Sequence, residues 1–329
     1  MGCTVPESPG PVPLEPRLEP AYLVLFRSGE LAERATRAVE RLASCDLCAR
    51  YCRVNRQLGI RRAVCRTGRR AVVQSFGPHH GEERPLSGTR GSGTIFFTWC
   101  NLRCVFCQNY QIAQLGEGDE VTADRLADMM LRLQYLGCHN INFVTPSHVV
   151  AQILEALVIA VEGGLRLPLV YNTGGYDSPE ALTLLDGVID IYLPDMKYGD
   201  SAIAYRHSKV RSYVDVNQAA VREMHRQVGD LVLDGDGVAR RGLLVRHLVL
   251  PGGLAGTEQV LGFLSRDVSP TASLNLMAQY RPCFKAGGYP PLDRRLTMEE
   301  FQSAVAAARR SGLRLVDGPD GDLDMESYR

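Results

Sequence analysis

The chain has 329 residues, of which 45% are hydrophobic and 22% are charged, a composition typical of a globular protein. Basic and acidic residues number 37 each, so the formal net charge is zero and no long-range field attracts nucleic acid or an anionic membrane. The sequence contains no run of about 18 apolar residues. We therefore expect neither a membrane-spanning helix nor a nucleic-acid partner.

The amino-terminal part divides into two predicted segments. Residues 1–20 are rich in proline and lack the apolar core of a signal peptide, which predicts a disordered lead-in and a cytoplasmic protein. Residues 21–44 carry apolar positions at helical spacing, which predicts one amphipathic helix. This helix opens a cysteine-rich module with its linker, which we expect over residues 21–90.

Ten cysteines are many for a chain without a secretory signal, and their close spacing favours metal or cluster ligation over disulfides. Four of them follow the predicted helix with the spacing C-x2-C-x3-C-x12-C: Cys45, Cys48, Cys52 and Cys65. Four thiols at this spacing suit either zinc or an iron–sulfur cluster, and spacing alone does not choose between them. The arginines around them would offset the charge of four thiolates or form a solvated face.

Residues 66–92 contain glycine and proline turns, which predict a link between this module and the rest of the chain. We expect the link to lay the module against the mouth of the functional site. Two histidines in it, His79 and His80, are candidate substrate contacts.

From about residue 93 onward, short apolar runs alternate with helical patterns. The runs predict strands at 93–99, 139–146, 167–175, 188–197, 243–252, 273–282 and 313–318. The helical patterns lie at 122–137, 149–164, 178–187, 198–230 with breaks, 256–265 and 297–312, the last with Thr297 and Glu300 as a capping box. Such alternation implies parallel strands joined by helical crossovers, and either a partial barrel or an open doubly wound sheet fits about six units.

Polar and glycine-rich segments follow six of the predicted strands. They are Cys100–Cys107, Thr145–His148, Asn172–Gly175, Asp195–Lys197, Pro251–Gly253 and Gln279–Tyr280. Because the carboxyl ends of parallel strands meet at one side of the sheet, we expect these segments to converge on one mouth that holds the functional site.

Three cysteines stand close together after the first of these strands: Cys100, Cys104 and Cys107. A structural zinc site usually takes four protein ligands, and a redox pair takes two thiols. Three thiolates suit a 4Fe–4S cluster with one iron left open for a small molecule. We interpret the three cysteines as the ligands of such a cluster.

The segment CNLRCVFCQNY has the spacing C-x3-C-x2-C with the aromatic Phe106 before the last cysteine, and it is similar to the signature of the radical S-adenosylmethionine (radical SAM) enzymes. The resemblance implies that the open iron binds S-adenosylmethionine. It further implies that one electron cleaves this cofactor to a 5′-deoxyadenosyl radical, which takes hydrogen from a substrate. The implied fold is an α/β, partial (β/α)6 TIM-like barrel preceded by a small cysteine-rich N-terminal module, with the core at 91–316 and an acidic tail at 317–329.

Over residues 90–285 the chain resembles the branch of pyruvate formate-lyase activating enzymes and their uncharacterised relatives. The matching segments are LPDMK with Asp195 and Lys197, VRHLVLPGG with Arg246, and YNTGGY with Asn172. The resemblance implies that these side chains, with Phe106, contact S-adenosylmethionine. It also implies a flavodoxin or ferredoxin as electron donor.

The Gly-Gly-Glu of that branch is replaced by VTPSH, so Ser147 or His148 would serve the amino group of the cofactor. His148 and Cys283 are the candidate catalytic residues. The substrate implied by the resemblance is a glycyl residue of a partner enzyme, and a small molecule or another peptide is the alternative. A non-catalytic iron–sulfur carrier is a further alternative.

Overall fold

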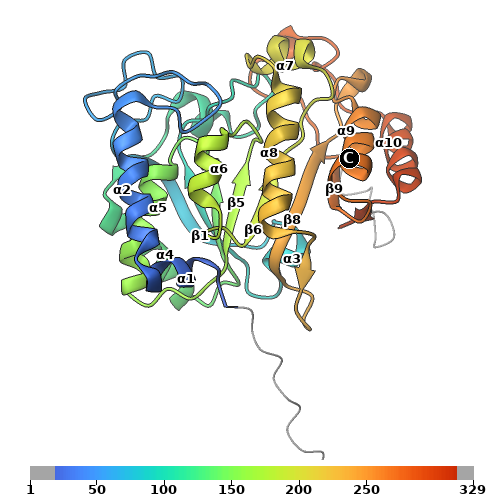
Figure 1. The fold of residues 1–329 in the computed structure, drawn as a ribbon. Helices are drawn as coiled ribbons and strands as arrows, with labels where there is room; N and C mark the ends of the chain where they lie inside the picture. Colours follow the sequence, from blue (N-terminus) through green and yellow to red (C-terminus); the bar gives the residue numbers. More distant parts are fainter. Residues whose placement is uncertain (1–18, 317–329) are drawn as a thin grey trace, which may run out of the picture.

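The structure, a computed structural model, describes residues 19–316, so nearly all of the predicted lead-in and the whole acidic tail lie outside it. Its centre is a mixed sheet whose parallel strands follow one another in chain order (Figure 1). These strands are β2 (Ser92–Phe97), β4 (Ile141–Val144), β5 (Leu169–Thr173), β6 (Ile191–Pro194), β8 (Ala239–Leu248), β9 (Ser273–Met277) and β10 (Arg314–Leu315). The short β7 (Val232–Leu233) pairs only with β8.

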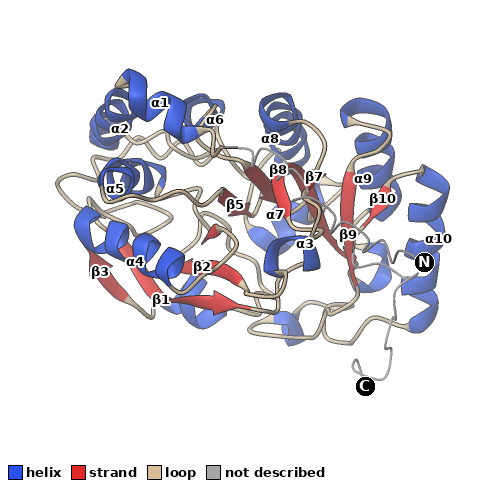
Figure 2. Cartoon of the chain, turned by 90° about the horizontal axis from the view of Figure 1, so that it is seen from below, coloured by secondary structure: helices blue, strands red, loops and turns tan. Residues whose placement is uncertain are grey.

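The strand order runs from β2 to β10 without reversal. A doubly wound sheet reverses its order at a switch point, so this topology is that of a partial barrel. Figure 2 shows the strands as a curved inner layer with the helices around the outside. The predicted α/β fold with a mostly parallel sheet is therefore confirmed.

The outer helices begin where the sequence carries capping residues. Thr122 caps α4 (Ala123–Tyr135), Ser178 caps α6 (Pro179–Leu185), and Thr297 with Glu300 forms the expected capping box of α10 (Met298–Ser311). The remaining crossover helices are α5 (Val150–Glu162), α7 (Ser201–Ser208), α8 (Tyr213–Val228) and α9 (Thr257–Phe263). No helix in residues 19–316 is long and apolar enough to cross a membrane.

The single helix predicted over 21–44 is wrong. Two helices stand there, α1 (Tyr22–Ser28) and α2 (Glu30–Glu40), with a short 3₁₀ turn after them. Gly29 separates them because it adopts φ 82°, a left-handed conformation that only glycine reaches without strain. The side chains of Tyr22 and Leu31 are buried in the same hydrophobic core as the barrel helices.

Most of the link predicted over 66–92 is ordered structure, which the sequence analysis did not predict. It contains β1 (Ala71–His79), which pairs antiparallel with β2 and with β3 (Asp119–Val121), and it ends with α3 (Arg84–Ser87). Pairing satisfies the backbone groups that an edge strand β2 would expose. His79 pairs with Ser92 at the amino end of β2, so His79 and His80 lie away from the cysteine loop and not at the mouth.

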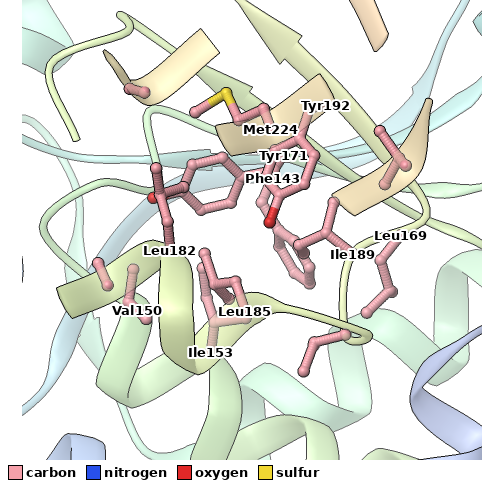
Figure 3. Packing of buried hydrophobic residues seen from close by; sticks show 14 of the residues in the cluster. Phe143, Val150, Ile153, Leu169, Tyr171, Leu182, Leu185, Ile189, Tyr192 and Met224 are labelled. Atoms are coloured by element: carbon pink, nitrogen blue, oxygen red, sulfur yellow. The ribbon is translucent and has the colours of Figure 1, made fainter. Parts of the chain in front are cut away.

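The main core fills the space between the outer face of the sheet and the helices. Figure 3 shows Phe143, Tyr171 and Tyr192 of three neighbouring strands packed with Leu182 and Leu185 of α6. All five side chains are almost fully buried. This layer holds the strands in register and so sets where their carboxyl ends lie.

Helix α3 packs against the inner face of the barrel. Its Leu86 is fully buried against Val170, Ile191, Leu193 and Leu244, which line that face on β5, β6 and β8. Since α3 follows β1 at the amino end of β2, it covers the end of the barrel opposite the cysteine loop.

We expect Leu86→Ala to lower the free energy of unfolding by about 2–5 kcal/mol, because it leaves a cavity inside the barrel. Denaturant unfolding followed by circular dichroism measures the change. Leu58→Ala is the control, since Leu58 is 87% exposed; its effect should stay within about 0.5 kcal/mol. Equal effects of the two variants would contradict the role assigned to α3.

Candidate functional site

The loop after β2 places three thiols at the carboxyl end of that strand. The Cys100 Sγ accepts the backbone N–H of Leu102 at 3.3 Å, and the Cys104 Sγ accepts the hydroxyl of Ser208 at 3.0 Å. The backbone N–H of Cys107 donates to the carbonyl of Cys104 at 3.3 Å. Hydrogen bonds to sulfur stabilise thiolates, so the loop is built for charged sulfur ligands.

The same loop is fixed from two sides by the backbone. The N–H groups of Arg103 and Val105 donate to the carbonyls of Ser208 and His207 at the end of α7, at 3.0 and 2.8 Å. The N–H of Lys285, after β9, donates to the carbonyl of Val105 at 2.8 Å. The loop therefore has little freedom to rearrange.

The aromatic residue of the motif, Phe106, is buried and packs edge-on against Tyr198 and Tyr280, at 6.4 and 5.9 Å between ring centroids. Through these contacts Phe106 packs the cysteine loop against the rest of the protein. Its predicted contact with a cofactor stays a prediction.

Burial dominates the electrostatics of the three thiols. It raises the pKa of Cys100 to about 11 and that of Cys107 to about 12, with neighbouring thiol charge as a further cause, and it also raises the pKa of Cys104. A metal or cluster that binds sulfur deprotonates such thiols. Three thiols, of which Cys104 is buried and the other two are half-buried, with hydrogen-bond donors to Cys100 and Cys104 and a nearby lysine, fit a cluster held by three thiolates.

A charged group lies beside this loop, on the inner face of the barrel. Three neighbouring strands present an apolar residue and then a polar one two positions later: Val170 and Asn172, Leu193 and Asp195, Leu244 and Arg246. Side chains two residues apart in a strand share a face, so the polar residues form a layer above the apolar one. The polar layer lies on the cysteine side.

Asp195 pairs with two cations in this layer. Its Oδ2 lies 2.5 Å from Lys197 Nζ, and its Oδ1 accepts Arg246 Nε at 3.1 Å. Arg246 also donates to Asn172 Oδ1 at 2.7 Å. Burial alone would lower the pKa of Lys197, but the charges of Asp195 and Cys104 raise it. The structure thus brings together the four residues predicted from three separate strand ends.

Two further acidic side chains join this layer, and the sequence analysis missed both. Glu82 Oε2 lies 3.5 Å and Glu83 Oε1 lies 3.9 Å from Arg246 Nη1. They belong to the segment predicted as a link, and adjacent acidic residues before a proline are usually exposed. The sequence carries no signal that would have placed them in the barrel.

The other predicted site residues lie at the edges of this group. Ser147 is buried and shares a hydrogen bond with Thr173 at 2.8 Å. His148 is buried, and its Nε2 lies 3.0 Å from the carbonyl of Thr98, just before the cysteine loop. Cys283 lies in the segment that pairs with Val105 through Lys285, and it is partly exposed. Their predicted roles stay predictions.

The four cysteines of the first group also lie together. Cys45, Cys48, Cys52 and Cys65 line one small cavity with Arg56, whose side chain is 1% exposed. Arg56 Nη1 donates to Cys45 Sγ at 3.4 Å, and its Nε donates to the carbonyl of Thr67 at 2.7 Å. Burial is the largest single effect on Arg56 and acts to lower its pKa. The charges of the Cys65, Cys45 and Cys48 thiols together outweigh it, so the pKa of Arg56 is raised.

The loop around these four cysteines is conformationally strained. Four of its residues adopt positive φ although none is glycine: Tyr51 (45°), Arg53 (53°), Arg62 (67°) and Arg66 (49°). Each such residue costs about 1–3 kcal/mol, so strain of this kind needs compensating contacts. No His, Cys, Asp or Glu side chains within residues 19–316 form a group of three or more that could hold a metal ion as they stand.

The two cysteine groups are neighbours in space. Arg50 Nε donates to the carbonyl of Asn101 at 2.6 Å, and the guanidinium of Arg103 donates to the carbonyl of Val64. The guanidinium of Arg66 lies 5.0 Å from the centre of the Trp99 ring. These contacts join the segment that holds Cys65 directly to the loop that holds Cys100.

Sequence comparison relates this chain to known proteins. A family model described as the radical SAM superfamily matches residues 94–233. The uncharacterised protein MJ0674 of Methanocaldococcus jannaschii is 33% identical over 282 residues, which make up 83% of this chain and 76% of that protein.

Solved structures show lower similarity. A radical SAM methyltransferase from Sphaerobacter thermophilus is 15% identical with a TM-score of 0.46, over 69% of this chain and 67% of that one. Streptococcus suis SuiB, bound to its precursor peptide SuiA, is 13% identical with a TM-score of 0.44, over 66% of this chain and 46% of that one.

Burial, followed by the charge of Arg56, lowers the pKa of His148 to about 3. This value lies below that of an unfolded histidine, about 6.5, so stability is lost as the pH falls from 6.5 toward 3. We expect His148→Gln to remove up to about 1.4 kcal/mol per pH unit from the pH dependence of the free energy of unfolding below pH 6. Denaturant titrations between pH 7 and pH 5 measure this. The partly exposed His225→Gln is the control, and identical slopes for wild type and His148→Gln would contradict the prediction.

Proposed function

Because the chain belongs to the radical SAM superfamily, we propose that Cys100, Cys104 and Cys107 hold one 4Fe–4S cluster and that the protein is an enzyme that cleaves S-adenosylmethionine. One observation carries this proposal: the three thiols lie on one loop at the carboxyl end of β2, near Lys197. Burial acts to lower the pKa of Lys197, but the charge of Asp195 and then that of Cys104 raise it. The cluster, when bound, supplies the electron for cofactor cleavage and so for hydrogen abstraction from a substrate.

The cations of the polar layer suit the carboxylate of the cofactor. Lys197 and Arg246 are charged at neutral pH, and both retain about one-fifth of their side-chain surface exposed. Asp195 holds both in place, so neither has to be ordered when an anionic group arrives. Arg246 Nη2 also donates to Asn172 Oδ1, which helps to hold the guanidinium in place.

The chain closes one end of the barrel, where Leu86 of α3 packs on the apolar inner face. At the other end the two cysteine-bearing segments contact one another through Arg50 and Asn101. A reaction that abstracts hydrogen needs such shielding, because reactive intermediates are lost to side reactions in open solvent.

A non-catalytic iron–sulfur carrier is the alternative function. A carrier gives no reason to bury Lys197 and Arg246 next to the cysteine loop, because buried cations cost free energy unless they are paired. The polar layer therefore favours an enzyme.

For the substrate we retain the activation of a glycyl radical enzyme as a proposal, with a flavodoxin or ferredoxin as electron donor. It is supported by the grouping of Asp195, Lys197, Arg246 and Asn172 that the resemblance implies. A small molecule or peptide is the second candidate, favoured because the cysteine-rich segment packs on the loop and restricts access for a large partner. A glycyl radical signal in pyruvate formate-lyase, after incubation with the reduced protein and S-adenosylmethionine, would support the first and its absence the second.

We also propose that the four amino-terminal cysteines hold a second centre, either zinc or an iron–sulfur cluster. Arg56 is almost fully buried, and within residues 19–316 it donates hydrogen bonds to the carbonyls of Thr67 and Gly68 and to the thiol of Cys45, of which only the thiol can become an anion. A permanent cation in the interior needs negative charge beside it, and metal-bound thiolates supply that charge. A centre bound to all four thiols would also compensate the strain of the loop.

We expect Cys104→Ala to lose the visible absorbance of the cluster and all formation of 5′-deoxyadenosine, because two thiolates remain for a site built for three. Both are measured on anaerobically reconstituted protein with dithionite and S-adenosylmethionine. Cys138→Ala, which alters a buried thiol after α4, is the control and should retain both. Cofactor cleavage by Cys104→Ala would contradict the assignment.

We expect Cys48→Ala to lose the second centre while keeping the iron held by the Cys100 loop. Iron, sulfide and zinc per chain are measured for this variant and the wild type. About four irons with one zinc in the wild type would identify zinc, and about eight irons would identify a second cluster. Unchanged metal content in Cys48→Ala would argue against any centre at these cysteines.

A further inference from the structure

Glu82 and Glu83 enter the barrel from the end opposite the cysteine loop. They follow β1, whose last residues pair with the amino end of β2, and they precede α3. Glu83 Oε1 accepts the side-chain amide of Asn275 in β9 at 2.9 Å, and both carboxylates approach Arg246 in β8. Their side chains are only 8% and 3% exposed.

The contacts order the charged groups along the interior. Lys197 interacts with the charge of Cys104, Asp195 pairs with both Lys197 and Arg246, and the two glutamates pair with Arg246. The pair is therefore deeper in the barrel than the cations assigned to the cofactor carboxylate. A substrate that lies below the cofactor would reach it first.

The charges of this layer do not balance. Three carboxylates, on Asp195, Glu82 and Glu83, face two cations, on Lys197 and Arg246, which leaves one negative charge in excess when all are ionised. Burial raises the pKa of Glu82 to about 7 against the opposing charge of Arg246, and the charge of Glu83 and a hydrogen bond with its carboxyl add to the rise. Excess buried negative charge is costly unless a cation accompanies it.

One oxygen of the pair also lacks an N–H or hydroxyl donor. Glu83 Oε2 is fully buried and accepts no such donor from residues 19–316. An unsatisfied buried acceptor costs about 1–3 kcal/mol, so a donor at this oxygen would be stabilising. A ligand with N–H donors and a positive charge would satisfy this oxygen and balance the layer at once.

We propose that Glu82 and Glu83 form the part of the substrate site that receives a positively charged nitrogen group, an ammonium or guanidinium, of the molecule that the enzyme modifies. This assignment rests on the proposed function, since it places the substrate beneath S-adenosylmethionine. It makes the substrate an amine, a guanidine, or a peptide with a basic side chain. An anionic substrate would meet like charge at this position, and a neutral one would leave the excess charge in place.

The amino group of S-adenosylmethionine is the rival occupant. The position of the pair argues against this occupant, because Asp195 and Arg246 lie between the two glutamates and Lys197 at the cysteine loop. The affinity for S-adenosylmethionine in the variants below decides between the two.

The test uses anaerobically reconstituted protein with S-adenosylmethionine and pairs of probes that differ in charge: Nα-acetyl-arginine amide against Nα-acetyl-citrulline amide, and Nα-acetyl-lysine amide against Nα-acetyl-norleucine amide. Calorimetry measures the dissociation constant of each. We expect at least one cationic probe to bind about tenfold or more tightly than its neutral partner, since a charge-assisted hydrogen bond is lost in the latter. Glu82→Gln and Glu83→Gln, which keep shape and remove charge, should each reduce this preference.

Glu120→Gln is the matched control, because Glu120 is exposed on β3 and should leave the preference unchanged. The proposal is overturned if the wild-type protein prefers neither cationic probe over its neutral partner, whether the probes bind equally well or do not bind at all. It is also overturned by a preference that survives in both variants, or by a loss of affinity for S-adenosylmethionine in them as large as the loss for the probe. Formation of 5′-deoxyadenosine by the same wild-type preparation separates these outcomes from failure of the proposed function.

Discussion

The paired carboxylate of Asp195 is the interaction on which the interior of the barrel depends. It lies between Lys197 and Arg246 and pairs with both. This pairing offsets the free-energy cost of removing the two cations from water. Burial acts to raise the pKa of Asp195, but the two cations lower it, so it stays ionised. The backbone of Asp195 also packs closely against Gly175. A Cβ at position 175 would lie 2.4 Å from the carbonyl oxygen of Asp195, so only glycine fits there.

The cysteine loop and the acidic pair lie on opposite sides of this charged layer. The cysteine loop lies above Lys197, and the acidic pair lies beyond Arg246. A cofactor carboxylate and a substrate cation would therefore meet opposite charges on the two sides of Asp195. Complementary charge of this kind orients both molecules before any chemistry begins.

The amino-terminal segment is part of this construction. Arg50 and Arg103 tie its backbone and that of the cysteine loop together, and β1 extends the barrel sheet. If a second centre is bound there, its charge acts at short range on the loop that holds Cys100. Arg103 already lies within reach of both Cys100 and Cys65, whose charges oppose the lowering of its pKa by burial.

Local signals predicted the outer shell of the fold well. Capping residues such as Thr122 and Ser178 predicted where helices begin, and apolar runs predicted the parallel strands. The prediction failed at Gly29 and at β1. A glycine inside a helical pattern does not reveal whether its φ is positive. Strand β1 has four of its nine residues exposed, so it lacks the apolar run of a buried strand.

The sequence by itself determined the three closely spaced thiols after an apolar strand, because ligands a few residues apart depend only on local chain geometry. It also indicated the family through that spacing. Only the tertiary structure decided that Glu82 and Glu83 meet Arg246, and that Arg56 is buried beside Cys45. These contacts are between segments that strand order and packing bring together. No local sequence pattern indicates which buried charged groups will face one another.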